Sequence, residues 1–549
     1  MKQILLFIFL GCYSMTIAQD TAIKKADLQS AAKLFDLQFT QKEIDTLYSD
    51  VLDNIANYKA MHKLSLDNSV PLSTWQLTLP NNHKKTTAAF SYSPIATGLP
   101  SNKNDLAFYS IGELAYLIKN KKISSLKLTQ FFIDRIKKYG DTLQCVISLQ
   151  ETIAYAQAKK ADEEIAQGKY RGLLHGIPYG LKDLFAVKGT KTTWGAAPYK
   201  NQVIEEDAFV YTQLQNAGAV LVAKFTLGAL AMGDYWYGGR TKNPWNLKYG
   251  SSGSSAGSTS ATVAGLVPFA IGTETYGSIV SPSTQCGATG LRPTFGSISR
   301  SGAMALSYSL DKIGPICRSA DDAAIVFNYI HGTDGKDLSA TNNPFNFTPS
   351  KDIKKLRIAY AKNYFDQIKD TTKNEWKVLA TFKKMGVELI PVNFPDSGFY
   401  NFNIMDVIIG VECAAQFDQM TRQNLDDELT RQTKYDWPNQ FRTARFVPAV
   451  EYINAQRHRT VLMHKVNEVI SKYDAIICPS RGVEGNQAAI TNLTGHPVVC
   501  VPTGFDQRNN LPTGITFVGN LYDEGTILKI ASAYQHQTSW NKQHPTLFK

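Results

Sequence analysis

Short apolar runs alternate with amphipathic segments along most of the chain after residue 105. Residues 219–225 (AVLVAKF) and 267–274 (VPFAIGTE) are apolar over the length of a strand, and a helical pattern near residues 209–217 precedes the first of them. Runs this short, bounded by glycine or polar residues, are typical of strands that are buried on both faces.

The second half of the chain repeats this alternation. Residues 356–361, 371–386 and 387–394 have the pattern of a strand, a helix and a strand. Three more apolar runs and a closing helix follow at residues 474–480, 496–504, 514–521 and 524–535. Strands that alternate with helices predict an α/β fold, in which a large mixed, mostly parallel sheet is covered by helices on both faces.

The region before residue 105 has a different pattern. One helix is predicted at about residues 40–63, and proline-containing loops follow it. Regular structure begins with Ser110 and Glu113, which form a capping box before an apolar-periodic helix. Two more helices are predicted, one from Ser124 to Gly140 and one at about residues 151–168. We therefore expect a helical and loop extension over residues 19–104 and one large domain over residues 105–549.

The first eighteen residues predict a signal peptide. Lys2 precedes the apolar run from Ile4 to Leu10, small or short residues follow at Thr16 and Ala18, and the chain then turns polar. We expect an exported protein, periplasmic or extracellular. Lipidation at Cys12 is a weaker alternative, because the apolar run before it is very short. No other stretch approaches the 18 continuous apolar residues of a membrane span, so stable membrane insertion is not expected.

Composition excludes several classes of protein. Of the 549 residues, 43% are hydrophobic and 19% are charged, which is typical of a globular protein. The net charge of +11 is scattered along the chain, so it does not predict a nucleic-acid partner. The six cysteines after the signal peptide lack metal-type spacing, and the spacing identifies no disulfide. We expect neither a metal ion nor another cofactor. Oligomeric state is left open.

Two unusual segments carry the candidate chemistry. Residues 250–289 are dense in serine and glycine, as flexible linkers are, yet a strand-like run interrupts them. Two tight loops around a buried strand would bring backbone N–H groups together, as an oxyanion hole requires. The other segment, residues 177–187 (IPYGLKDLFAV), places Lys182 in an apolar run, where an ammonium group is costly unless it finds a partner or loses its proton.

Taken in order, GIPYGLKD (176–183), GSSAGS (253–258) and GTETYGSIVSP (272–282) resemble the amidase signature family. Further similarity extends through residues 287–324 and 492–520, and the resemblance covers roughly residues 105–540. Ser254 and Ser278 are 24 residues apart, which is the spacing in that family. The resemblance implies the amidase signature fold and an amide substrate that is a small molecule.

The resemblance also implies a Ser–cis-Ser–Lys triad. In it, Ser278 is the nucleophile, Ser254 relays the proton and Lys182 is the base, with a cis peptide bond between Gly253 and Ser254. The N–H groups of the four residues that end at the nucleophile form the oxyanion hole: Thr275, Tyr276, Gly277 and Ser278. A buried lysine has the chemistry for this role, because desolvation lowers its pKa from about 10.4 toward neutrality.

The sequence departs from the family pattern at four positions. Ser252 replaces a glycine before the first serine pair, and Ala256 replaces a glycine after it. Both residues are small. Tyr276 stands where glycine is frequent beside the nucleophile, so a bulky ring must be accommodated there. Val280 stands where many members carry arginine, which puts in doubt any substrate preference that depends on that cation. The sequence does not identify the physiological substrate.

Four alternatives remain open from the sequence. Residues 253–257 match the G-x-S-x-G pattern of α/β-hydrolase esterases, with Ser255 as nucleophile and downstream histidines at His464, His496 and His536. Ser124–Lys127 matches S-x-x-K, although helix capping explains Ser124 better. An amidase-like fold retained as a catalytically silent binding protein is the third. The last is a transamidase subunit of the same family, which the signal peptide disfavours because that role is cytoplasmic.

Overall fold

The computed structural model describes residues 23–64, 79, 87, 89–396, 400, 403–480 and 487–549. The predicted signal peptide and Cys12 lie outside the described residues, so export stays a prediction. Among the described residues, no helix combines the length and the apolar character needed to cross a membrane.

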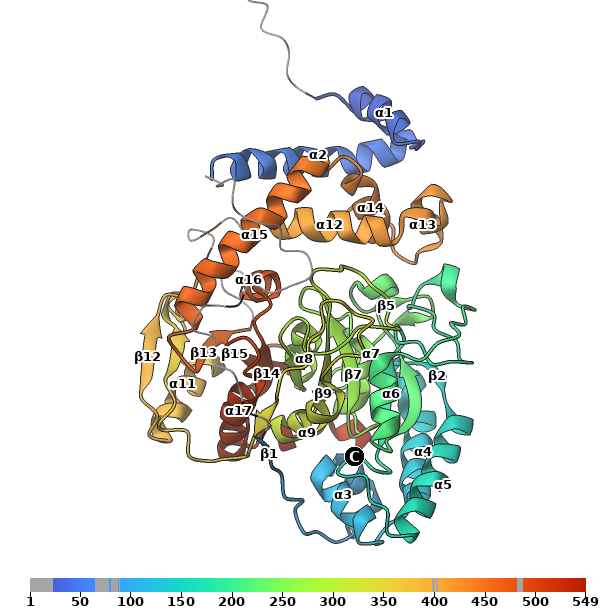
Figure 1. Ribbon diagram of the computed structural model, residues 1–549, viewed down its shortest axis with the longest axis vertical. Helices are drawn as coiled ribbons and strands as arrows, with labels where there is room; N and C mark the ends of the chain where they lie inside the picture. Colours follow the sequence, from blue (N-terminus) through green and yellow to red (C-terminus); the bar gives the residue numbers. More distant parts are fainter. Residues whose placement is uncertain are drawn as a thin grey trace, which may run out of the picture.

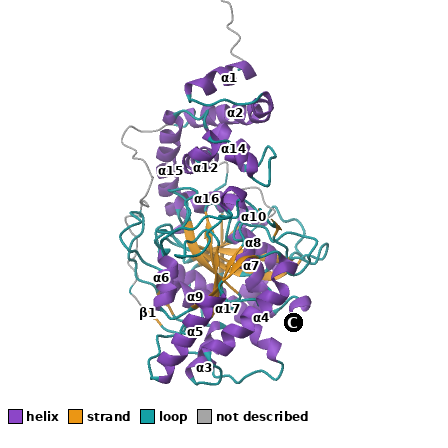
Figure 2. Cartoon of the chain, turned by 90° about the vertical axis from the view of Figure 1, so that its right-hand side faces the viewer, coloured by secondary structure: helices purple, strands orange, loops and turns teal. Residues whose placement is uncertain are grey.

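One large sheet occupies the centre of the molecule (Figures 1 and 2). Its eleven strands have the spatial order β12-β11-β13-β15-β14-β8-β9-β7-β3-β4-β2. In chain order they are β2 (Val146–Leu149), β3 (Pro178–Lys182), β4 (Val220–Phe225), β7 (Ala270–Glu274), β8 (Thr289–Arg292), β9 (Lys312–Cys317), β11 (Ile358–Ala361), β12 (Leu389–Val392), β13 (Ala475–Pro479), β14 (Val498–Phe505) and β15 (Pro512–Val518). Two small two-stranded sheets pair β1 (Ala89–Phe90) with β10 (Asn346–Phe347) and β5 (Tyr235–Trp236) with β6 (Gly239–Arg240).

The strand directions are mixed. On one side β7, β3 and β4 are parallel neighbours, and on the other β13, β11 and β12 are. Between these groups, the pairs from β7 through β9, β8, β14 and β15 to β13 are antiparallel, as is β2 at the edge. The prediction of a mixed sheet in an α/β fold is confirmed. The middle of the sheet is less parallel than the alternation of strands and helices suggests. β9 follows β8, and β15 follows β14, with no helix between the two strands, and both pairs are antiparallel.

Helices surround the sheet (Figure 2). Those before β9 are α1 (Lys25–Leu34), α2 (Gln41–His62), α3 (Ile111–Lys119), α4 (Ser125–Leu143), α5 (Glu151–Ala166), α6 (Phe209–Asn216), α7 (Ala256–Val263) and α8 (Val280–Cys286). Those after β9 are α9 (Ala320–Ile330), α10 (Lys362–Phe365), α11 (Asn374–Lys384), α12 (Ile404–Gln416), α13 (Asp418–Arg422), α14 (Trp437–Ala444), α15 (Ala449–Ile470), α16 (Gln487–Thr494) and α17 (Glu524–Thr538).

Alternate residues of each central strand face opposite layers, which is the two-residue period of a strand. In β14, Val499 and Val501 join an apolar cluster with residues of α9, α11 and α17. Val498 and Cys500 join another cluster with residues of α12, α15 and α16. Both faces of the sheet are therefore buried, which explains why the strands are apolar without alternation.

The predicted helices are present, with small shifts at their ends. The Ser110 hydroxyl accepts from the N–H of Glu113, whose carboxylate accepts the Ser110 N–H, so the capping box is confirmed. The helix expected to stop at Gly140 is longer: α4 continues to Leu143 and ends at Gln144, which adopts the left-handed conformation. Gly140 is instead buried inside the helix, where an added Cβ would lie 3.0 Å from Val146 Cγ2. Close packing against β2 accounts for that glycine.

The N-terminal helices form a separate layer at one end of the molecule (Figure 1). α2 packs against α12 and α14, and the Arg442 guanidinium on α14 forms an ion pair with Glu43 on α2 at 2.6 Å. Between α1 and α2 lies a small apolar cluster that contains Leu28, Ile44 and Leu47. This layer is therefore attached to the helices beyond the sheet rather than to the sheet itself.

Leu47→Ala tests the cohesion of this layer. The Leu47 side chain is fully buried, so its loss should lower the free energy of local opening of α1 and α2 by about 2–5 kcal/mol. Hydrogen–deuterium exchange should become faster over residues 25–62 and stay unchanged in β3 and β7. Leu52→Ala is the matched control, because Leu52 on the same helix is 38% exposed. Equal effects of the two variants would contradict the packing described.

Candidate active site

Two parallel strands direct their carboxyl ends to one edge of the sheet. β3 and β7 are neighbours, with Leu181 opposite Ile271. Because parallel strands end at the same edge, Lys182 at the end of β3 lies beside the loop of residues 275–279, which follows β7. This loop leads into α8 and carries Ser278.

A second loop, residues 250–255, reaches the same edge before α7. The Gly253–Ser254 peptide bond is cis, as the resemblance implies. A Cβ added to Gly253 would lie 1.8 Å from the carbonyl oxygen of Gly233, so only glycine allows this backbone approach. A Cβ added to Gly272 on β7 would lie 2.6 Å from Ser255 Oγ, so a glycine also allows β7 to pack closely against this loop.

The Lys182 side chain joins the two loops. Its Nζ lies 2.8 Å from Ser254 Oγ and 2.8 Å from Thr273 Oγ1. Ser255 Oγ is farther away at 3.2 Å, and the Thr273 carbonyl oxygen lies at 3.4 Å. The amine is thus surrounded by hydroxyl and carbonyl oxygens, and it contacts the serine to which we assign the relay.

Lys182 has no carboxylate partner among the described residues. Two nearby acids are bound elsewhere: Asp183 pairs with Lys224 at 2.9 Å, and Glu274 pairs with Arg292 at 3.1 Å. Lys182 is fully buried, and this burial lowers its pKa to about 7, against the opposing charges of Asp311 and Glu274. A substantial fraction of this amine is therefore neutral at physiological pH.

Ser278 lies next to this group and is 8% exposed. Its carbonyl oxygen accepts a hydrogen bond from the Ser255 N–H at 3.1 Å, which ties the two serine loops together. The structure thereby brings Lys182, Ser254 and Ser278 to one edge of the sheet. These are the three residues that the sequence predicts to act together.

The predicted oxyanion loop also has a suitable geometry. Gly277 has a φ of 88°, in the left-handed region that favours glycine. Within the described residues, the N–H groups of Thr275, Gly277 and Ser278 donate to no acceptor. Tyr276 is 38% exposed, so its ring is accommodated at the surface. Donors in one short turn that face no protein acceptor can serve an anion that forms beside Ser278.

Three positions in this region were not singled out as site residues by the sequence analysis. Thr273 contacts Lys182, as described above. Asp311 accepts from the Thr275 hydroxyl at 2.5 Å. Glu274 accepts from the N–H groups of Ile279 and Val280, the two residues after Ser278, at 2.8 and 2.9 Å. An acidic residue at the end of an apolar strand was the available signal for Glu274. Asp311 gave no such signal because it is remote in sequence.

Ser255 lacks the geometry of an exposed nucleophile. It is fully buried, and its hydroxyl donates to the Thr273 carbonyl at 3.1 Å and accepts from the Thr273 N–H at 3.2 Å. In the part of the chain that the structure describes, none of the three downstream histidines forms a hydrogen bond with it, and His496 is instead bonded to Thr494. Ser124 caps α4 by accepting from the Lys127 N–H, as helix capping predicts. Ser255 therefore lacks an activating histidine there, and the Ser124 hydroxyl is used as a helix cap.

Within the described residues, no three His, Cys, Asp or Glu side chains are grouped so that they could hold a metal ion.

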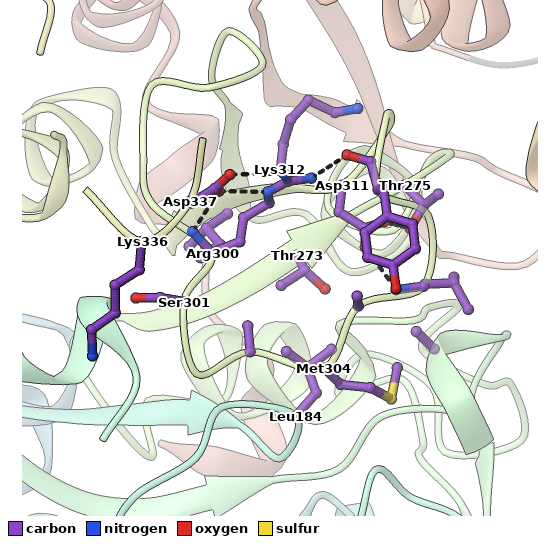
Figure 3. A pocket seen from close by; sticks show the side chains of 16 residues that line it. Leu184, Thr273, Thr275, Arg300, Ser301, Met304, Asp311, Lys312, Lys336 and Asp337 are labelled. Carbon is purple, nitrogen blue, oxygen red and sulfur yellow. Dashed lines mark hydrogen bonds and ion pairs between the residues drawn. The ribbon is translucent and has the colours of Figure 1, made fainter. Parts of the chain in front are cut away.

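A cavity of about 200 Å³ opens beside this group of residues (Figure 3). Thr273 and Thr275 form part of its wall, and the loop of residues 300–313 forms much of the remainder. Neither Ser254 nor Ser278 lines it. The cavity adjoins the candidate site at Thr273, whose hydroxyl contacts Lys182, and at Thr275 in the predicted oxyanion loop.

Comparisons with known proteins agree with this geometry. A sequence model described as Amidase matches residues 127–528. The A subunit of the glutamyl-tRNA(Gln) amidotransferase of Coxiella burnetii is 33% identical over 483 residues, which is 80% of this chain and 99% of that protein. The solved peptide amidase of Stenotrophomonas maltophilia is 25% identical with a TM-score of 0.71, over 79% of this chain and 98% of that one. The solved A subunit of the glutamyl-tRNA(Gln) amidotransferase of Thermotoga maritima is 26% identical with a TM-score of 0.66, over 80% and 98%.

Substitution by methionine should destabilise the fold to different extents at two fully buried lysines. Lys224→Met leaves the Asp183 carboxylate buried without its cation and should lower the free energy of unfolding by about 3–5 kcal/mol. Lys182→Met removes an amine that has no carboxylate partner among the described residues. It leaves the hydroxyls of Ser254 and Thr273 without that donor, so the loss should be smaller, about 1–3 kcal/mol. Urea unfolding at pH 7.5, followed by circular dichroism, measures both. Equal losses would mean that an ion pair holds Lys182.

Proposed function

The chain belongs to the amidase signature family, and on that premise we propose that it hydrolyses a carboxamide or a related amide bond through an acyl-enzyme on Ser278. We assign the bond to the carbon–nitrogen class other than peptide bonds. The observation that carries the proposal is the 2.8 Å contact between Ser254 Oγ and a buried Lys182 amine whose pKa is about 7. A neutral amine in contact with a relay serine can act as a general base at physiological pH.

The proposed reaction begins with attack of Ser278 Oγ on the amide carbonyl carbon. Ser254 takes the hydroxyl proton of Ser278 as it passes its own proton to Lys182 Nζ. The negative charge that develops on the carbonyl oxygen is stabilised by the N–H groups of Thr275, Tyr276, Gly277 and Ser278. The carbon–nitrogen bond then breaks, and the proton returns through Ser254 to the leaving nitrogen. This step releases ammonia or an amine.

Water completes the cycle along the same proton path. It loses a proton through Ser254 to Lys182 as its oxygen attacks the acyl carbon. Cleavage of the ester bond then returns that proton to Ser278 Oγ and releases the carboxylic acid. Every proton in this scheme is carried by hydroxyl and amine groups of the chain, so the scheme calls for no cofactor.

A second candidate function comes from the relatives' names. Relatives named as the A subunit of glutamyl-tRNA(Gln) amidotransferase are 32–33% identical and matched over 99% of their length. A similar role here would make this chain one component of an assembly, and its oligomeric state is open. The predicted signal peptide favours the independent hydrolase. Amide hydrolysis by the purified chain alone would support the hydrolase, whereas activity that needs partner subunits would support the transamidase role.

We expect Ser278 to be the residue that is acylated. A fluorophosphonate should label the protein on Ser278, and Ser255→Ala should keep substantial labelling, because the Ser255 hydroxyl is already bonded to the Thr273 backbone. Digestion and mass spectrometry identify the labelled residue. An adduct on Ser255 would favour the esterase alternative, and a protein that resists labelling would favour the silent binding protein.

Lys182 should control the pH dependence of the reaction. The base must be neutral to accept a proton, so kcat/KM should rise with pH through about pH 7, where the Lys182 ammonium loses its proton. Lys182→Arg keeps the charge but does not deprotonate at any usable pH, and Lys182→Ala removes charge and base together. Both variants should lose at least about 10²–10⁴-fold in activity and flatten the rising limb.

Lys224→Arg is the matched control for these variants, since Lys224 is equally buried but contacts Asp183. A folded Lys224→Arg enzyme should keep the rise of kcat/KM with pH near pH 7. An active Lys182→Arg enzyme with an unchanged pH profile would remove Lys182 from the mechanism.

A further inference from the structure

The cavity beside Thr273 is positioned to receive part of a substrate. Thr273 Oγ1 lies 2.8 Å from Lys182 Nζ, and Thr275 belongs to the loop that ends at Ser278. Figure 3 shows Thr273 in the middle of the lining residues, with Leu184 and Met304 on one side and Arg300 with Asp337 on the other. When a substrate carbonyl is held at Ser278, the group attached to that carbonyl lies next to this cavity.

The part of the wall below Thr273 in Figure 3 is apolar. Leu184 and Met304 form it, and both are buried. The other apolar residues that line the cavity include Leu306 and Ile313, which are buried, and Ala303. The volume is about 200 Å³. A protein cavity of about 150 Å³ with apolar walls holds benzene, so this one has room for a phenyl ring or a short branched alkyl chain.

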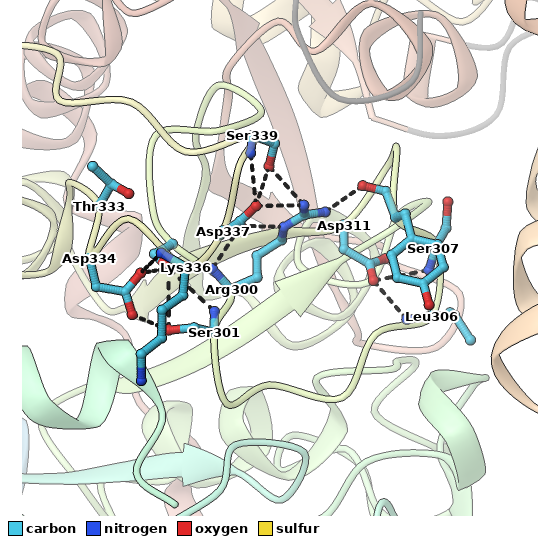
Figure 4. Close-up of polar contacts among 12 residues, drawn as sticks. Arg300, Ser301, Leu306, Ser307, Asp311, Thr333, Asp334, Lys336, Asp337 and Ser339 are labelled. Carbon is cyan, nitrogen blue, oxygen red and sulfur yellow. Dashed lines mark hydrogen bonds and ion pairs between the residues drawn. The ribbon is translucent and has the colours of Figure 1, made fainter.

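The charged groups along the opposite wall are already bound to one another (Figure 4). The Arg300 guanidinium donates to Asp337 Oδ2 at 2.7 Å and to Oδ1 at 3.0 Å. It also donates to the Ser339 hydroxyl at 2.7 Å and to the Tyr308 carbonyl at 2.6 Å. The charge of Arg300 is therefore neutralised by Asp337, and most of its donors are used within the protein rather than offered to the carboxylate of a substrate.

Asp311, the other acid of this wall, is occupied as well. One carboxylate oxygen accepts from the Thr275 hydroxyl, and the other accepts from the N–H groups of Leu306 and Ser307 at 2.7 and 3.0 Å. Both oxygens are thus bound by the loops that surround the cavity. A cationic substrate group would have to compete with these contacts.

The two lysines of the lining do not supply a cation to the interior. The Lys312 amine donates to the carbonyl of Leu310, and burial lowers its pKa well below the ordinary value. Lys336 is exposed, and in Figure 3 its ammonium is directed away from Thr273. An anionic substrate group inside the cavity would therefore lack a free counter-ion among the described residues that line it.

We propose that this cavity binds the acyl group of the carboxamide, and that it selects an uncharged, apolar acyl group of about the size of a phenyl ring or a branched five-carbon chain. This inference rests on the proposed function, because it takes the acyl carbon to be held at Ser278. It goes further by naming the substrate class: aromatic or branched aliphatic amides rather than amides that carry a carboxylate or an amino-acid group.

A matched pair of amides tests the charge selection. 4-Methylpentanamide and succinamate have acyl groups of the same length and branching, but the first ends in two methyl groups and the second in a carboxylate. A buried charge without a partner is costly, so kcat/KM should be at least about a hundredfold higher for 4-methylpentanamide. Benzamide should also be cleaved better than glutamine. Equal or better cleavage of succinamate or glutamine would overturn the proposal.

Ala303→Leu tests whether the acyl group binds in this cavity. The larger side chain fills part of the cavity, so kcat/KM for benzamide should fall at least about tenfold, in line with the cost of a few methylene groups in a hydrophobic pocket, while acetamide should be cleaved within about threefold of the parent rate. Ala156→Leu on the outer helix α5 is the control, because Ala156 is exposed and does not line the cavity. An equal loss for acetamide and benzamide in Ala303→Leu would place the acyl group elsewhere.

Binding to a Ser278→Ala enzyme separates this proposal from the proposed function. Calorimetry should detect 4-methylpentanamide and benzamide but not succinamate, and Ala303→Leu in that background should weaken the binding of benzamide at least about tenfold. Selective binding with no turnover of any amide by the parent enzyme would contradict the proposed hydrolysis and leave the cavity assignment supported. Turnover of amides without this selective binding would support the proposed hydrolysis and contradict the cavity assignment.

Discussion

The burial of a lysine without a carboxylate partner among the described residues is the constraint around which this site is organised. Lys182 lies at the end of a strand that is covered on both faces, so water does not stabilise its ammonium form. The two acids that flank it in the fold are bound by Lys224 and Arg292. Burial therefore dominates, and the pKa of Lys182 falls to about 7. Had Asp183 faced Lys182, the amine would stay charged and could not accept a proton.

The Glu274 carboxylate, which pairs with Arg292 and not with Lys182, also holds the loop of Ser278 in place. Glu274 binds Arg292 and Asn492 through one carboxylate oxygen and the N–H groups of Ile279 and Val280 through the other. Burial alone would raise its pKa, but Arg292 and these hydrogen bonds hold the pKa below its usual value. The ionised Glu274 carboxylate thus anchors the backbone directly after Ser278, and Arg292 neutralises its charge.

The cavity and the reactive centre share one loop. Asp311 binds the Thr275 hydroxyl with one oxygen and the backbone of Leu306 and Ser307 with the other. Ser307 in turn donates to the buried Glu412 on α12. Through these contacts, the loop that lines the cavity is fixed both to the turn before Ser278 and to the helices beyond the sheet. The shape of the cavity and the geometry of the oxyanion loop are consequently set together.

The sequence by itself determined the local elements and pointed to the candidate reactive residues. Apolar runs without alternation indicated the buried strands, the Ser110–Glu113 capping box indicated the start of α3, and the order of Lys182, Ser254 and Ser278 indicated the candidate triad. The tertiary structure decided what depends on residues distant in the chain. Gly140 continued a helix instead of ending it, because β2 packs against it. Asp183 bound Lys224 on β4 and Glu274 bound Arg292 on β8, and these pairings left the Lys182 amine among hydroxyl groups. Hydrophobic patterning is a local signal that each strand or helix carries alone, whereas the pKa of a buried group and the lining of a cavity depend on which strands become neighbours.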